Sequence, residues 1–369
     1  MRPTPPVRRP TLTAALAAGL AAAVAAWPTA AHAIAVAPPT DVCVIDDPRA
    51  IEISGLVATR TGYVAINDSQ FESEKMHILY LDASCEVTST LPYPTPARDP
   101  EDLAIAPDGA LWVADTGDNV EAQNHRETVA LWLIPSDGGP PVIHRLVYPD
   151  GPHDAEALLF AGDGTPVIIT KETSGVAGLY QPTGPLQVRN TTGVTLKKVG
   201  EFTPVSSGEN NQFGTMGELL VTGAATAPDR TKVALRTFTA AYEWDVSGGD
   251  IVKAITTLRP RLTGLPDEPQ GEALAYTPDG KALLTVSDQL GPTVIRRHEP
   301  SSAPLETPPP PAPPANAAPE PSGLAGTPLW LTLAAGVVGL GLAVAGFLGL
   351  RHARRAGAAA SANQRPKGG

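Results

Sequence analysis

The sequence is poor in basic residues, in aromatic residues and in the common catalytic motifs. Between residues 34 and 300 it has 19 Lys and Arg against 36 Asp and Glu, a net charge of −17. Nucleic-acid binding needs a basic surface, so this acidic body excludes it as the function. Only 5% of the residues are aromatic, which disfavours a carbohydrate-binding platform. Glycine-rich phosphate loops, GxSxG and CxxC are absent from the sequence, so the chemistries that depend on them are not expected.

Residues 1–33 have the composition of a targeting segment rather than of a folded domain. They consist of a basic start, an Ala- and Leu-rich run and a small-x-small site at Ala31-His32-Ala33. This three-part layout is typical of a secretory signal peptide, so we expect the mature chain to begin at Ile34. The pair Arg8-Arg9 also fits a weak twin-arginine signal, which leaves the choice between the Sec and twin-arginine routes open.

The C-terminal part predicts a single membrane anchor. Residues 328–350 carry no charge and are long enough to cross a bilayer. Residues 351–369 contain five basic residues and no acidic one, so the positive-inside rule places them in the cytoplasm. Residues 300–327 are rich in proline and are expected to form an extended stalk. The prediction is a type I single-pass protein of the cell membrane, with residues 34–299 outside the cell.

Two cysteines, Cys43 and Cys85, lie in the part of the chain that is predicted to be exported. Exported cysteines in an even number usually form disulfides, and this pair predicts one. A metal-binding pair is the alternative, although neither cysteine has a histidine or a further cysteine nearby to complete such a site.

Five internal repeats decide the predicted fold. They align without gaps over their first nine residues, and in four of them Gly lies eight places after the first residue. The repeats begin at Ser54, Glu101, Glu156, Thr222 and Glu272. In three of the repeats Pro-Asp lies six and seven places after the first residue. Each of the five repeats is followed by a run of β-forming residues. This pattern predicts antiparallel strands joined by tight turns.

The spacing of the repeats, from 47 to 66 residues, suits the four-stranded blades of a β-propeller. A single blade cannot bury both faces of its sheet, so neighbouring blades must stack in a ring. We therefore predict an all-β ectodomain at residues 34–299, a five- or six-bladed β-propeller, followed by the single transmembrane helix. The longest interval leaves room for a degenerate sixth blade, and residues 41–50 are expected to close the ring. A β-sandwich with accidental similarity between segments is the alternative.

Carboxylates recur at corresponding positions of the repeats. In a meander the residue that opens the first strand lies near the end of the second, which pairs Glu101 with Asp115 and Glu272 with Asp288. If the first strands line a channel, these side chains gather at one mouth of it. The candidate metal-binding residues are Asp68, Glu101, Asp115, Glu156, Glu172 and Glu272. An all-oxygen donor set favours Ca²⁺ ahead of Mg²⁺, whereas carboxylates that only cap backbone amides and solvate the rim are the alternative.

Residues 99–119, DPEDLAIAPDGALWVADTGDN, resemble the blades of NHL-type and SMP-30/gluconolactonase-like propellers. The triplets that begin at Glu101, Glu156 and Glu272 are similar to those of secreted phytase-related, esterase-like propellers. The SMP-30 resemblance implies a metal held by Glu, Asn and Asp, with a late Asp acting as base. Asp288 is the counterpart of that base, whereas Ser54 stands where a metal-binding Glu would be expected.

Two functions from different classes follow from these observations. The first is an extracellular module that binds a ligand or a cell-surface protein, with Ca²⁺ at the acidic channel mouth. The alternative is a metal-dependent hydrolase of the lactonase, esterase or phosphoesterase type, with Asp288 as the catalytic base.

Overall fold

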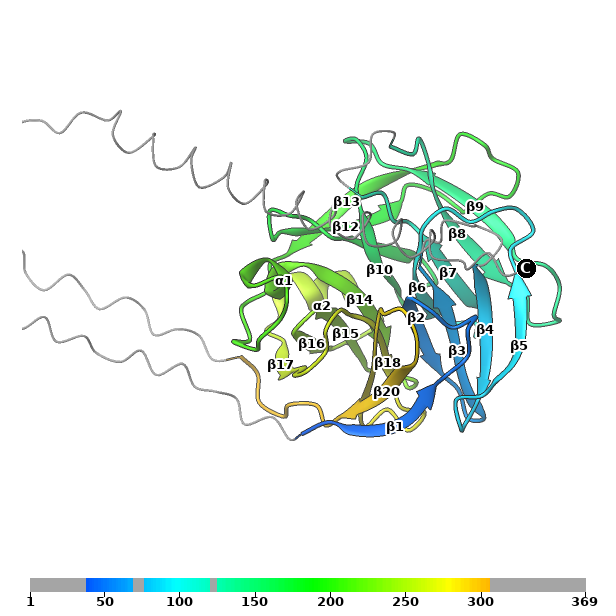
Figure 1. Ribbon diagram of the computed structural model, residues 1–369. Helices are drawn as coiled ribbons and strands as arrows, with labels where there is room; N and C mark the ends of the chain where they lie inside the picture. The colour runs from blue at the N-terminus through cyan, green and yellow to red at the C-terminus, as the bar shows by residue number, and fades with distance from the viewer. Residues whose placement is uncertain (1–37, 69–75, 120–124, 306–369) are drawn as a thin grey trace, which may run out of the picture. The chain divides into compact units, whose positions relative to one another are not determined.

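The computed structural model describes residues 38–68, 76–119 and 125–305, which are mostly β-strand (Figure 1). The predicted signal peptide, transmembrane helix and cytoplasmic tail lie outside the described residues, as does the proposed stalk beyond residue 305. Within the described ranges, no helix has the length and apolar character that a membrane span requires.

The strands form five antiparallel units of four, called blades here. Blade 1 contains β2 (Ile53–Ala58), β3 (Gly62–Asn67), β4 (His77–Asp82) and β5 (Val87–Pro92). Blade 2 contains β6 (Pro100–Ile105), β7 (Leu111–Asp115), β8 (Val129–Ile134) and β9 (Val142–Val147). Blade 3 contains β10 (Ala155–Phe160), β11 (Pro166–Thr170), β12 (Ala177–Pro182) and β13 (Val194–Phe202). Blade 4 contains β14 (Val221–Thr226), β15 (Lys232–Thr237), β16 (Ala240–Asp245) and β17 (Arg261–Gly264).

Blade 5 combines the two ends of the described chain. It contains β18 (Gly271–Tyr276), β19 (Leu283–Ser287), β20 (Thr293–His298) and, as its outer strand, β1 (Thr40–Ile45). The pairing of β1 with β20 confirms that the first strand closes the ring. The disulfide between Cys43 and Cys85 is also confirmed, and it links blade 5 to the turn between β4 and β5 of blade 1.

The first strand of every blade lies at the centre of the fold. Each of β2, β6, β10, β14 and β18 contacts the next, and β18 contacts β2, so the five strands form a closed ring (Figure 1). The axis of this ring is called the channel here, and all five inner strands start at the same end of it. The result is an all-β, propeller-like fold with five blades in the described residues.

The interval from Glu156 to Thr222 does not contain a sixth blade. It is filled by a long β13, a loop at 203–214 and the short helix α1 (Thr215–Leu219). The start of β13 pairs in parallel with β9, at Val194 with Leu146 and at Thr195 with Val147. This pairing joins blades 2 and 3 into one eight-stranded sheet.

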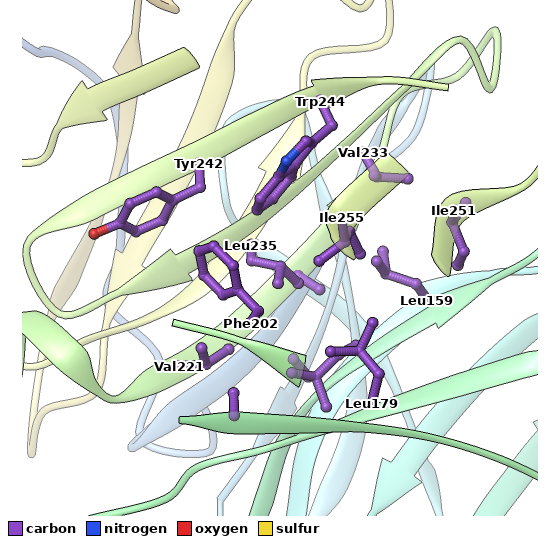
Figure 2. Packing of buried hydrophobic residues seen from close by; sticks show 14 of the residues in the cluster. Leu159, Leu179, Phe202, Val221, Val233, Leu235, Tyr242, Trp244, Ile251 and Ile255 are labelled. Atoms are coloured by element: carbon purple, nitrogen blue, oxygen red, sulfur yellow. The ribbon is translucent and has the colours of Figure 1, made fainter. Parts of the chain in front are cut away.

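Apolar side chains fill the spaces between neighbouring blades. Between blades 3 and 4, Phe202 packs edge-on against Tyr242 and Trp244, with ring centroids 5.2 and 5.1 Å apart (Figure 2). Helix α2 (Ile251–Thr257) covers this cluster with Ile251 and Ile255, and the Asp250 side chain caps its first turn.

Candidate functional site

Every inner strand has a β-bulge at the same point, close to its start. The register shifts lie between residues 53 and 55, 100 and 102, 155 and 157, 221 and 223, and 271 and 273. The bulged residues are Ser54, Glu101, Glu156, Thr222 and Glu272, which are the first residues of the five sequence repeats. A bulge leaves one residue unpaired and redirects its side chain, so the fold presents five equivalent side chains at one channel mouth.

A second set of side chains comes from the residue directly after each second strand. The set consists of Asp68, Thr116, Lys171, Phe238 and Asp288. In three blades the amide of this residue donates to the carbonyl two residues before the bulge: Asp68 to Glu52, Lys171 to Asp154 and Asp288 to Gln270, at 2.7 to 2.8 Å. The repeated hydrogen bond holds the end of the second strand against the start of the first.

Seven carboxylates meet at this mouth in three overlapping groups. The groups are Asp68, Glu272 and Asp288; Asp68, Asp99 and Glu101; and Glu101, Asp154 and Glu156. Within each group, one oxygen of every member lies within 4.8 Å of the others. Asp68 belongs to the first two groups and Glu101 to the last two, so the seven residues form one continuous carboxylate cluster.

Among the described residues, the side chains of Lys171 and Gln270 donate to the carboxylate cluster, and the backbone amide of Asp118 donates to Asp154 Oδ1 at 3.0 Å. Lys171 Nζ donates to Glu156 Oε1 and lies 5.5 Å from the centre of the Phe238 ring. Gln270 Nε2 donates to Glu272 Oε1 at 3.3 Å and also to Asp288 Oδ2. These donors satisfy only part of the acceptor capacity of seven carboxylates.

Several carboxylate oxygens of the cluster are buried and accept no hydrogen bond from the described residues. They include Glu156 Oε2, Glu272 Oε2 and Asp288 Oδ1, and the Glu156 and Glu272 residues are only 5% and 4% exposed. Burial raises the pKa of Glu156 to about 8 and that of Asp288 to about 7. Burial, followed by repulsion from neighbouring carboxylates, also raises the pKa values of Glu101 and Glu272 well above their ordinary range. The cluster therefore retains protons near neutral pH unless a cation replaces them.

The structure brings five of the predicted site residues into the carboxylate cluster. They are Asp68, Glu101, Glu156, Glu272 and Asp288. Asp115 lies outside it, because β7 ends one residue later than expected and its last side chain turns away. Asp115 accepts from Trp132 Nε1 at 3.1 Å and pairs with Arg126 at 2.8 Å.

Glu172 also lies outside the cluster, because β11 ends one residue earlier than expected. Its carboxylate contacts His153 Nδ1 at 2.7 Å. Lys171 occupies the place in the cluster that the repeat pattern had assigned to Glu172. Blade 3 therefore contributes an ammonium group where blades 1 and 5 contribute Asp68 and Asp288.

The repeat pattern did not predict four residues at the carboxylate cluster: Asp99, Asp154, Gln270 and Lys171. The first three precede a bulged Glu by two residues, in the triplets at 99–101, 154–156 and 270–272. Side chains two residues apart lie on the same side of a strand, so this period could have indicated them. Lys171 has no such signal, because it breaks the acidic pattern.

Two of the five bulged residues, Ser54 and Thr222, have hydroxyl groups that bridge neighbouring blades, and they do not belong to the carboxylate cluster. Ser54 Oγ donates to the carbonyl of Pro100 at 2.9 Å, and Thr222 Oγ1 donates to that of Gly271 at 2.8 Å. Each acceptor directly precedes the bulged Glu of the next blade. These hydrogen bonds fix the positions of Glu101 and Glu272.

No protein-family model matches the chain, and no curated protein matches it in sequence. Solved structures do resemble it in fold. A glutaminyl cyclase from Myxococcus xanthus is 12% identical over 72% of this chain and 97% of its own, with a TM-score of 0.42. The Cps50 (Swd1) β-propeller domain from Myceliophteria thermophila is 11% identical over 70% and 99%, with a TM-score of 0.37. A luciferin-regenerating enzyme is 14% identical over 67% and 77%, with a TM-score of 0.37.

Proposed function

We propose that the protein is a membrane-anchored, extracellular β-propeller that binds a ligand at its channel mouth, with Ca²⁺ held by the carboxylate cluster. The observation that carries the cation site is the set of buried oxygens without hydrogen-bond partners on Glu156, Glu272 and Asp288. A buried, unsatisfied acceptor costs about 1–3 kcal/mol, and a bound cation would remove that cost. An all-carboxylate donor set suits a hard cation with several oxygen ligands, and Ca²⁺ fits it best.

The charge of the carboxylate cluster supports the same proposal. Seven carboxylates meet here, and among the described residues the ammonium group of Lys171 donates to one of them, Glu156. Ionising all of them together is unfavourable in a buried site, because like charges raise one another's pKa. A divalent cation lowers this repulsion and releases protons. The group of Asp68, Glu272 and Asp288 would hold the first ion, because two of its members have a buried oxygen without a hydrogen-bond partner.

An extracellular location is consistent with a site of modest affinity. Extracellular Ca²⁺-binding modules work at dissociation constants of about 10⁻⁴–10⁻³ M, since the ion is abundant there. The signal peptide, the stalk and the anchor that the sequence predicts would place the channel mouth outside the cell. The partner is then a soluble ligand or a cell-surface protein, and nucleic acid is not expected.

Calorimetric titration of the purified full-length chain with CaCl₂ tests the proposal. We expect saturable Ca²⁺ binding that Glu272→Gln weakens at least tenfold. Asp108→Asn is the matched control, because Asp108 lies in an exposed turn where its Oδ1 accepts from its own turn. Absence of Ca²⁺ binding by the folded wild-type protein, or equal loss in both variants, would contradict the proposal.

A metal-dependent hydrolase is the second candidate, and the position of Asp288 favours it. Asp288 is only partly buried, it belongs to the group with Asp68 and Glu272, and its Oδ1 has no hydrogen-bond partner. A carboxylate in this position could accept a proton from a water molecule. A panel of lactones, esters and phosphoesters with Ca²⁺ tests this function: turnover that Asp288→Asn abolishes would establish it. No turnover on the panel would leave the binding function.

A further inference from the structure

A cavity lies in the channel at the end opposite the carboxylate cluster. Its volume is about 250 Å³, and it is lined by the ends of β2, β6, β14 and β18 and by the turns that follow them. The inner strands all start at the cluster and are six residues long, so the two ends of the channel are roughly 20 Å apart. The lining reaches inward to Leu103 and Leu274, but the cavity shares no residue with the carboxylate cluster.

The wall of this cavity is apolar. Leu56, Leu103 and Leu274 contribute to it, while Ala104 and Ala225 leave the space open because their side chains are short. The Tyr276 hydroxyl, the polar end of one lining residue, donates to Glu243 at 2.7 Å and is not available to a ligand. An apolar cavity of about 150 Å³ holds benzene, so this one has room for a ring with a short chain.

The charged side chains that line the cavity are both arginines, Arg60 and Arg230. Arg230 Nη2 donates to the carbonyl of Ile105 at 3.1 Å and to that of Ala106, and so reaches from blade 4 to blade 2. Arg60 is exposed in the turn that follows β2. Asp108 and Asp229 lie in turns at the same end, where each accepts an amide hydrogen within its own turn and neither lines the cavity. Asp108 also interacts electrostatically with the Arg230 guanidinium.

We propose that this cavity binds a small organic acid, a monocarboxylate whose body is an aromatic ring or a short acyl chain. The apolar body fills the channel end, and the carboxylate meets the guanidinium groups of Arg60 and Arg230. Because the charged side chains among the lining residues are both cationic, the cavity favours an anion over a neutral compound of the same shape. This site does not require the carboxylate cluster or Ca²⁺.

Titration of the full-length chain with 3-phenylpropionate and with 3-phenylpropan-1-ol tests the proposal. We expect the acid to bind at least fivefold more tightly than the alcohol, with or without Ca²⁺. Arg60→Gln should remove this preference, and Lys197→Gln should retain it, since Lys197 is an exposed cation on β13 away from the cavity. Ala225→Leu, which fills the cavity, should weaken both ligands more than tenfold.

Several results would overturn this inference. They are the absence of binding by both compounds, equal affinity for acid and alcohol in the wild type, and binding that Ala225→Leu leaves unchanged. If Ala225→Leu does not fold, as judged by its thermal unfolding, the comparison of Arg60→Gln with Lys197→Gln decides. Loss of Ca²⁺ binding with acid binding retained would refute the cluster site alone.

Discussion

The pH dependence of stability follows from the raised pKa of Glu156. Between about pH 4.5 and pH 8 the folded protein retains a proton on this carboxyl that the unfolded chain releases, so stability falls as the pH rises. A rise in pKa from 4.5 to about 8 corresponds to about 5 kcal/mol at most. Ca²⁺ binds the ionised cluster, so it should restore stability at high pH and have little effect at low pH.

Thermal unfolding between pH 5.5 and pH 8.5, with EGTA or with 5 mM CaCl₂, measures this effect. Between pH 5.5 and pH 8 the raised pKa of Glu156 accounts for about 3 kcal/mol of this loss. For a domain of this size each kcal/mol shifts the midpoint by about 2–4 °C, so the midpoint in EGTA should fall by about 6–12 °C. With CaCl₂ it should stay nearly constant. Glu156→Gln should flatten the EGTA curve, whereas Asp108→Asn should not. Parallel pH curves with and without Ca²⁺ would refute the reasoning, because the cluster would then titrate without binding the ion.

Three further predictions concern individual residues. A Cβ at Gly117 would lie 2.1 Å from Glu101 Oε1, so Gly117→Ala should lower the Ca²⁺ affinity at least tenfold by calorimetry, and an unchanged affinity would contradict this close packing. Cys43→Ser opens a disulfide that spans 42 residues, and it should cost about 4 kcal/mol in urea unfolding; no loss would mean that the linkage does not hold the ring closed. Arg236→Met removes the buried guanidinium that lies 2.6 Å from Glu268, and it should cost about 3–5 kcal/mol in the same assay, unlike the exposed control Lys197→Gln.

The repeats were sufficient to predict the fold because each carries its own strand and turn signals. The number of blades was left open by the residues between Glu156 and Thr222, since a loop with a short helix has no distinct pattern there. Ring closure by β1 could be predicted because a blade with three strands needs a fourth.

The candidate site could be predicted in outline but not in register. The β-bulges that redirect Glu101 and Glu156 have no signal in the sequence, and a strand that ends one residue early or late exchanges one side chain for the next. In the structure, Thr116 therefore stands at the place predicted for Asp115, and Lys171 at the place predicted for Glu172. The contacts of such residues depend on the exact end of each strand, which only the paired backbone determines.

The pairing of β1 with β20 also sets the order in which the protein can be assembled. The first strand is synthesised before any blade exists, yet among the described residues it pairs with the last strand, β20. The ring therefore stays open until nearly all of residues 38–305 have been synthesised. The disulfide between Cys43 and Cys85 needs only β1 and blade 1, so it can hold β1 beside blade 1 before β20 is in place. β20 then completes the ring by inserting between β19 and the tethered strand.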